Sequence, residues 1–226
     1  MSRSLISRRG FPARFWRLTG IDVLTHAIRS LHLQLEPTTL PMGFVCRLCA
    51  WFCTLPRAVA NGRNDSRSRE KMANAATIAG MVLGNSSVAL AHALGHTAGR
   101  AVSWETHGNI TAVFLPYTLQ FAAQQRRGGP SRDDANVLHL PPPMNKKPWR
   151  CSGSQIFQLL DQIGLPGSLK AASIREDQFL GLLPRMVEHV EIDANVLMSP
   201  RITTTAEVEK LLRCCLRRPC GGFLVE

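Results

Sequence analysis

The sequence contains one aspartate and several histidines whose spacing suits the ligands of a divalent metal ion. Asp22 and His26 are four residues apart in LTGIDVLTHAI, His92 and His96 are four apart in ALAHALGH, and His107 follows in ETHGN. On a helix, a spacing of four places two side chains one turn apart on the same face. The candidate ligands are Asp22, His26, His92 and His107. Three neutral imidazoles and one carboxylate leave a divalent ion with net positive charge, which suits a Lewis acid.

Each pair also has a simpler interpretation on residue type alone. Asp22 then stabilises the start of a helix, and His26 is an ordinary hydrogen-bonded histidine. His92 and His96 lie on an Ala- and Leu-rich face and are then satisfied core histidines. Spacing alone leaves both interpretations open.

The composition indicates a globular protein. The chain has 226 residues, of which 45% are hydrophobic, so it can bury an ordinary core. The net charge of +11 lies mainly in the N-terminal segment and in residues 126–154, and no nucleic-acid-binding motif accompanies it, so we expect no nucleic-acid partner. No apolar run approaches the roughly 20 residues that cross a bilayer, and we expect no membrane span.

The cysteines favour a reducing compartment. There are seven, an odd number without regular disulfide spacing, and buried free thiols are the expected state. We therefore predict a cytoplasmic location. The first twenty residues are rich in Arg and Ser and lack acids, which leaves a mitochondrial targeting segment as an alternative.

Helical periodicity dominates the chain and predicts an all-α helical bundle. The expected helices cover residues 21–33, 42–53, 68–83, 88–102, 108–123, 155–163, 176–190 and 205–216. Residues 1–18 are interpreted as a basic tail or the remnant of an inter-domain junction, and residues 19–226 as one helical metal-binding domain. Its Gly- and Pro-rich stretch at 126–154 is predicted to be a loop or disordered insert.

Several motifs in order resemble the C-terminal helical domain of the iron-containing (group III) alcohol dehydrogenases. They are LTGIDVLTHAI, the block SREKMANAATIAGMVLGNSSVALAHALGHTAG, HGNITAVFLPYTLQF, IGLPGSLKAASIREDQF and DANVLMSPRITTTAEVEKLL. The resemblance implies that Asp22, His26, His92 and His107 are the ligands of Fe2+, with Zn2+ as the alternative ion. It also implies that His96 is a catalytic and cofactor-binding residue beside the nicotinamide of NAD(P), on the proton path.

The implied activity is oxidation of a small alcohol to an aldehyde or ketone with NAD(P), and a homo-oligomer is an expected state. The sequence departs from the family's pattern in lacking the GGGS phosphate loop of its nucleotide-binding domain. Arg29 replaces the usual Glu, and the interval from His96 to His107 is one residue longer. We therefore interpret the chain as the metal-binding catalytic half, with a separate nucleotide-binding domain as partner. The alternative is a truncated, catalytically inactive metal-binding or interaction domain.

Overall fold

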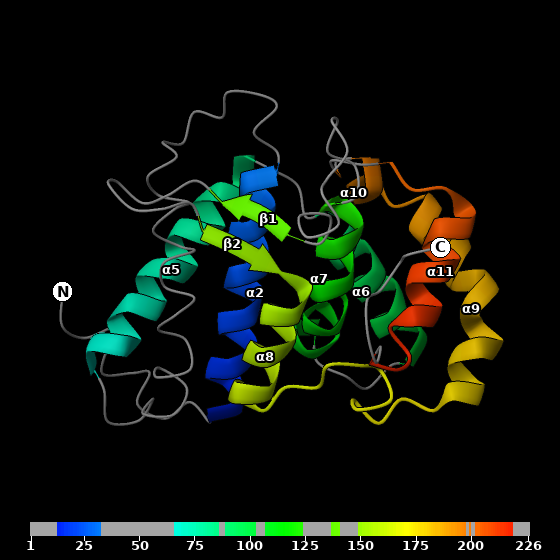
Figure 1. Ribbon diagram of the computed structural model, residues 1–226, viewed down its shortest axis with the longest axis horizontal. Helices are drawn as coiled ribbons and strands as arrows, with labels where there is room; N and C mark the ends of the chain where they lie inside the picture. Colours follow the sequence, from blue (N-terminus) through cyan, green and yellow to red (C-terminus); the bar gives the residue numbers. More distant parts are fainter. Residues whose placement is uncertain are drawn as a thin grey trace. The chain divides into compact units, whose positions relative to one another are not determined.

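Helices make up most of the part of the chain that the computed structural model describes (Figure 1). The described residues are 13–32, 66–85, 89–102, 107–123, 137–140, 149–197, 199 and 202–218. The elements are α2 (Ala13–His32), α5 (Ser66–Asn85), α6 (Ala89–Val102), α7 (His107–Ala123), β1 (Val137–Leu140), β2 (Trp149–Ser152), α8 (Gly153–Ile163), α9 (Glu176–Glu191), α10 (Ala194–Leu197) and α11 (Thr205–Cys214). The predicted helical fold class is confirmed. Among these residues, no helix combines the length and apolarity needed to cross a bilayer.

The chain divides into two units, each with its own internal packing. Unit 1 comprises residues 1–86 and 141–148, and unit 2 comprises residues 87–140 and 149–226. In unit 1, α2 packs against α5, whose buried positions Met72, Ala75 and Ala79 recur at helical spacing. Helix α2 begins at Ala13, earlier than predicted.

Helix α7 is the centre of unit 2, where it packs against α6, α8 and the two strands. Its residues from Gly108 to Phe121 are all buried. A helix that is apolar on every side is stable only where neighbours cover it. Pro116 lies inside the helix and removes one backbone donor, while the Thr118 hydroxyl donates to the carbonyls of Phe114 and Leu115 at 3.2 and 3.1 Å.

Glycines let α6 approach α7 closely. A Cβ on Gly95 would lie 3.0 Å from Thr111 Oγ1 and 3.4 Å from Thr111 Cα, and one on Gly99 would lie 3.3 Å from Ile110 Cδ1. These two glycines are four residues apart and so lie on the same face of α6. The Gly95 contact leaves less room than the Gly99 contact, because it includes the backbone of Thr111, whereas the end of the Ile110 side chain can move.

The remaining helices end and begin at strong local signals. Gly164 follows α8 in a left-handed conformation (φ 67°), and the Leu165 amide donates to the Leu160 carbonyl at 2.9 Å, which closes the helix in a Schellman motif. Helix α11 begins with a capping box, in which the Glu207 amide donates to Thr204 Oγ1 and the Thr204 amide donates to Glu207 Oε2.

The stretch 126–154 differs in part from the predicted loop. Within it, β1 pairs antiparallel with β2, Val137 opposite Ser152 and Leu140 opposite Trp149, and α8 begins at Gly153. Strand pairing depends on a partner farther along the chain, so neither four-residue segment signals it alone. The predicted helix at 42–53 and its cysteines lie outside the described residues.

Candidate functional site

Helix α2 holds the first pair of candidate ligands in unit 1. Asp22 Oδ2 lies 3.7 Å from His26 Nε2, with side chains that are 32% and 11% exposed. This separation exceeds an ordinary hydrogen bond. Two ligand atoms about 2.1 Å from one tetrahedral ion lie about 3.4 Å apart, so a single cation fits between these atoms with a small adjustment.

Helix α6 holds the second pair in unit 2. His92 is 2% exposed among Ala and Leu neighbours, whereas His96 is half-buried. The ring centroids of the two histidines lie 5.9 Å apart at an interplanar angle of 67°, an edge-to-face contact. The spacing of four therefore places both rings on one face, as predicted from the sequence.

His107 is the first residue of α7, and its side chain lies outside the described residues. The structure thus brings Asp22 together with His26 in α2, and His92 together with His96 in α6. The set of four ligands, Asp22, His26, His92 and His107, stays a prediction.

A cavity of about 670 Å³ opens in unit 2 where α6 packs against α9. His96, Thr97 and Arg100 line it from α6, and His189, Ile192 and Asp193 line it from the last turn of α9 and the residues that follow. A volume of this size suits a small molecule. The contribution of α9 had no signal in the sequence, because only the packing of α6 against α9 brings these distant segments together.

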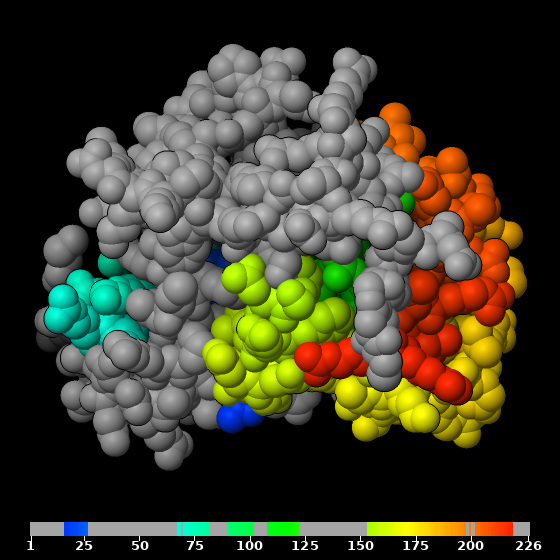
Figure 2. Space-filling view, in the orientation of Figure 1, coloured from blue at the N-terminus to red at the C-terminus, as the bar shows by residue number. Residues whose placement is uncertain are grey.

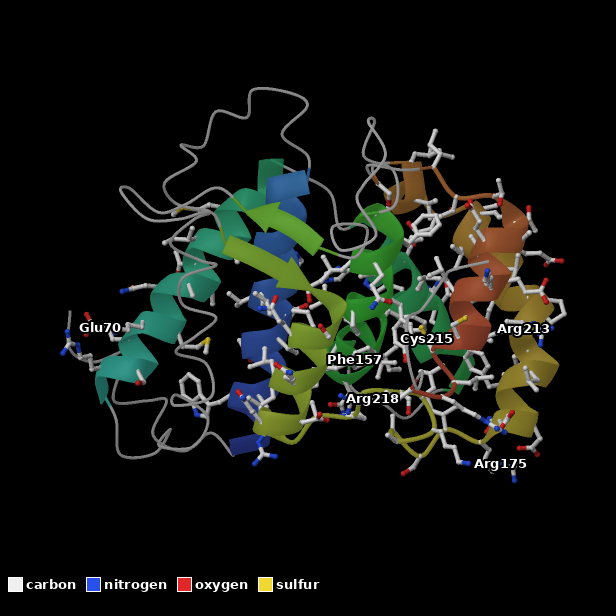
Figure 3. All side chains as sticks on the ribbon, viewed as in Figure 1. Glu70, Phe157, Arg175, Arg213, Cys215 and Arg218 are labelled. Carbon is white, nitrogen blue, oxygen red and sulfur yellow. The ribbon has the colours of Figure 1, made fainter. Side chains whose placement is uncertain are left out.

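Tyr117 has a packing role rather than a place in this cavity. It is fully buried, its hydroxyl donates to the Gly167 carbonyl at 3.3 Å, and its ring meets that of Phe157 edge to face at 5.5 Å. Burial, aided by the Cys215 thiol, raises the pKa of Tyr117. The Arg218 guanidinium lies over the Phe157 ring at 4.7 Å (Figure 3). Arg218 Nη1 also donates to both carboxylate oxygens of Asp161, at 2.7 and 2.9 Å, which holds the end of the described chain on α8.

Cys214 and Cys215 are free thiols, as predicted. Cys215 is buried, and that burial raises the pKa of its thiol well above the usual range. Neither cysteine contributes to the cavity lining. A reactive or metal-binding role for these two cysteines has no support from their surroundings.

Comparison with known proteins gives consistent relatives. The chain is 28% identical over 174 residues to the aldehyde-alcohol dehydrogenase of Streptococcus pneumoniae, covering 71% of this chain and 19% of the relative. It is 28% identical over 215 residues to the 1,3-propanediol dehydrogenase of Citrobacter freundii, covering 90% of this chain and 51% of the relative. The solved structure of a 1,3-propanediol oxidoreductase matches with a TM-score of 0.72 and 25% identity, covering 94% of this chain and 54% of that one.

The chain thus spans about half the length of the two propanediol enzymes and a smaller share of the aldehyde-alcohol dehydrogenase. The family match is continuous, running from residue 17 to residue 216 and including all the candidate ligands. The chain belongs to the Fe-containing alcohol dehydrogenase family, of which it carries the C-terminal domain.

Proposed function

We propose that this chain is the metal-binding catalytic half of an NAD(P)-dependent alcohol dehydrogenase that interconverts an alcohol with its aldehyde or ketone. The single observation that carries the proposal is the Asp22–His26 pair, whose ligand atoms lie 3.7 Å apart on one face of α2. Membership of the Fe-containing alcohol dehydrogenase family supports it independently.

The proposed ligands of one divalent ion are Asp22, His26, His92 and His107. A carboxylate and three imidazoles are a donor set that accepts both Fe2+ and Zn2+, and Fe2+ is the proposed ion because of the family. His92 is buried on α6, and burial favours the neutral imidazole, which is also the form that binds a metal ion. The fit of the α2 pair to ligand geometry is the structural support for this set.

When bound, the ion would supply Lewis acidity to the oxygen of the alcohol or carbonyl substrate. We assign proton transfer to His96, and two observations support this: its ring contacts that of His92, and it lines the cavity. A histidine exchanges protons near neutral pH, so a ring nitrogen of His96 can take the hydroxyl proton.

The nicotinamide would carry the redox chemistry. An NADPH-dependent butanol dehydrogenase from Clostridium saccharobutylicum is among the relatives, 26% identical over 204 residues. That relative is about twice the matched length. A nucleotide-binding domain is therefore the proposed partner, and a homo-oligomer is the proposed assembly.

Metal binding by matched variants tests the proposal. Isothermal titration of the full chain with Zn2+, and with Fe2+ under argon, should give about one equivalent per chain. Asp22→Asn and His92→Ala should each weaken metal binding by about tenfold or more. Removing a group that only hydrogen-bonds a metal ligand already costs about 10- to 100-fold in affinity, and removing the ligand itself should cost at least as much. Asp177→Asn is the control, because that exposed carboxylate pairs only with Arg175 in the described contacts and belongs to no candidate site.

Turnover is measured separately, as NAD(P)-linked oxidation of 1-butanol and 1,3-propanediol with a nucleotide-binding domain of the family supplied. Unchanged metal binding in Asp22→Asn and His92→Ala would contradict the ligand assignment. Metal binding without any turnover under these conditions would favour the alternative, a catalytically inactive metal-binding or interaction domain.

A further inference from the structure

The first turn of α6 is capped by a side chain from a distant part of the chain. The Leu90 amide donates to Ser199 Oγ at 3.0 Å, although the two residues are 109 positions apart. Leu90 is the second residue of α6, a position whose amide a capping side chain commonly satisfies. Such a cap usually comes from the residue just before the helix, whereas Ser199 follows α10. Ser199 therefore links the start of α6 to the C-terminal part of unit 2.

The capped turn is buried, so water is a poor substitute for its cap. Leu90 is 4% exposed, Ala91 6% and His92 2%. A buried backbone amide without an acceptor costs free energy comparable to a lost hydrogen bond. Removal of Ser199 Oγ would therefore favour a first turn that shifts or frays until the Leu90 amide finds another acceptor. His92 lies two residues after this amide and would move with the turn.

Ser199 is itself held by hydrogen bonds, which makes its hydroxyl a fixed acceptor. Its amide donates to the Val196 carbonyl at 3.0 Å, and the Val196 amide donates to the Asp193 carbonyl at 2.9 Å. Val196 is buried on α10, which packs against α6 (Figure 1). Because a serine side chain is short, this packed backbone sets where the hydroxyl lies.

Two contacts thus fix the part of α6 that carries His92. Three residues after His92, Gly95 packs closely against α7. Two residues before His92, the Leu90 amide is held by Ser199. Helix ends fray, so the Gly95 contact alone would leave the turn before His92 loosely held. A metal ligand must be held within about 0.5 Å of its productive position, which makes the second contact important for binding.

We propose that Ser199 is a positioning residue, whose hydroxyl fixes the first turn of α6 and thereby holds the His92 ring where a divalent metal ion can bind. The inference rests on the proposed function, because it takes His92 as a metal ligand. In this assignment Ser199 contacts neither the metal ion nor the substrate and acts only through the Leu90 amide. The same contact ties the helix of His92 to the segment that lines the cavity at Ile192 and Asp193.

Matched cap deletions on two helices test the inference. Ser199→Ala removes the cap of α6, and Thr204→Ala removes the cap of α11, where Thr204 Oγ1 accepts from the Glu207 amide at 3.3 Å. Cap deletions have similar costs, so both variants should melt at a lower temperature than the unaltered chain. Only Ser199→Ala should also weaken Zn2+ binding to the full chain in isothermal titration. The expected loss is about three- to tenfold, below the roughly 10- to 100-fold for a group that hydrogen-bonds a ligand directly.

Two spectroscopic measurements distinguish a displaced ligand from a less stable helix. The visible absorption of bound Co2+ depends on the number and geometry of its ligands, so Ser199→Ala should alter this spectrum and Thr204→Ala should not. In the metal-free chain, the NMR signals of the His92 ring should shift in Ser199→Ala and stay in place in Thr204→Ala. Ser199→Thr keeps a hydroxyl and should restore the spectrum and the affinity. Ser199→Cys keeps the size but offers only a weak acceptor, so it should behave like Ser199→Ala.

Unchanged metal affinity and unchanged His92 signals in Ser199→Ala would overturn the inference and leave the proposed function standing, since His92→Ala should still weaken metal binding. The same holds if Thr204→Ala lowers the metal affinity as much as Ser199→Ala does, because general loss of stability then explains both. If Ser199→Ala does not fold, Ser199→Cys supplies the same comparison with the volume kept. Shifted His92 signals in Ser199→Ala, in a chain whose unaltered form binds no Zn2+, Fe2+ or Co2+, would support the positioning of His92 by Ser199 and contradict the proposed function.

Discussion

Two helix pairs of unit 2, α6 with α7 and α9 with α11, are packed by different means. Between α6 and α7 the backbones approach closely at Gly95, and Thr111 and His92 are buried polar residues of this pair. Helices α9 and α11 pack against each other, and their buried residues are larger apolar side chains, whereas their charged side chains are exposed. Examples of the buried apolar residues are Phe179, Leu183, Val208, Leu211 and Leu212.

The α9–α11 pair carries its charged side chains on the surface, whereas the α6–α7 pair has buried polar residues. In the space-filling view, α9, α10 and α11 (yellow to red) form a continuous part of the surface of unit 2 (Figure 2). Exposed ion pairs lie on it, such as Arg213 Nη2 with Glu209 Oε1 at 2.7 Å. Buried polar groups cost free energy unless they are paired, whereas exposed charges cost little. The α6–α7 pair, which carries His92 and His96, is therefore the more constrained one, and the α9–α11 pair is an ordinary supporting layer.

The largest loss of stability should follow truncation of a large buried side chain in the supporting pair, α9 with α11. Phe179 on α9 is fully buried. Phe179→Ala should lower the free energy of unfolding by about 3–5 kcal/mol, through lost burial and the cavity left behind. Urea denaturation measures this loss in the free energy of unfolding. Ile202→Ala, at a side chain that is 70% exposed, should change stability by less than about 0.5 kcal/mol and serves as the control.

In the α6–α7 pair, replacing a glycine by a larger residue should lower the stability. A Cβ at Gly95 meets Thr111 Oγ1 at 3.0 Å, so Gly95→Ala should destabilise by about 1–3 kcal/mol through overpacking. Gly181 on α9 has nothing within 4 Å of the same added atom. Gly181→Ala should therefore stabilise by about 0.5–1 kcal/mol through helix propensity. If both substitutions stabilise the chain in thermal melts, the two pairs do not differ in backbone approach.

The pH dependence of stability should report the buried thiol at the end of α11. Burial raises the pKa of Cys215 well above the ordinary 9.0. As the pH rises, the thiol therefore loses its proton at a lower pH in the unfolded chain than in the folded chain. The stability contribution is complete below pH 9 and falls above it, by up to about 1.4 kcal/mol per pH unit. Tyr117, whose pKa burial also raises, adds to the fall above pH 10.0. Cys215→Ala should flatten the slope between pH 9 and 10, and an unchanged slope would show that this thiol is not the source.

The exposed charges of the supporting pair should contribute least. Arg213 and Glu209 are about half exposed and lie one turn apart on α11. Arg213→Gln should cost only about 0.3–0.5 kcal/mol, and the loss should disappear at high salt. A double-mutant cycle with Glu209→Gln isolates the pair. A coupling above 1 kcal/mol would mean that this surface is more constrained than its exposure indicates.

Much of the fold follows from local sequence signals. Gly164 ends α8 because only glycine readily takes its left-handed conformation, and Thr204 with Glu207 begins α11 through a capping box. The histidine spacing on α6 likewise predicts the shared face that His92 and His96 occupy. These features depend on neighbours within one or two turns, so the sequence contains all the information they need.

Other features depend on contacts between distant segments. The pairing of β1 with β2 joins strands that carry no strong alternation of apolar and polar residues. Helix α2 begins at Ala13 rather than at the predicted Ile21, because Thr19 favours a helix start on local preference but lies inside the helix. Tertiary packing overrides such weak local preferences.

Helical periodicity was enough to predict the all-α class, and several motifs in a fixed order were enough to predict the family, because both are recorded in residue types along the chain. Histidine spacing named the candidate ligands but left a metal site and ordinary core histidines both open. The cavity between α6 and the end of α9, and the room that Gly95 leaves for Thr111, are known only from the folded chain. Those contacts join residues far apart in the chain, and their closeness results from how whole helices pack, which no local spacing records.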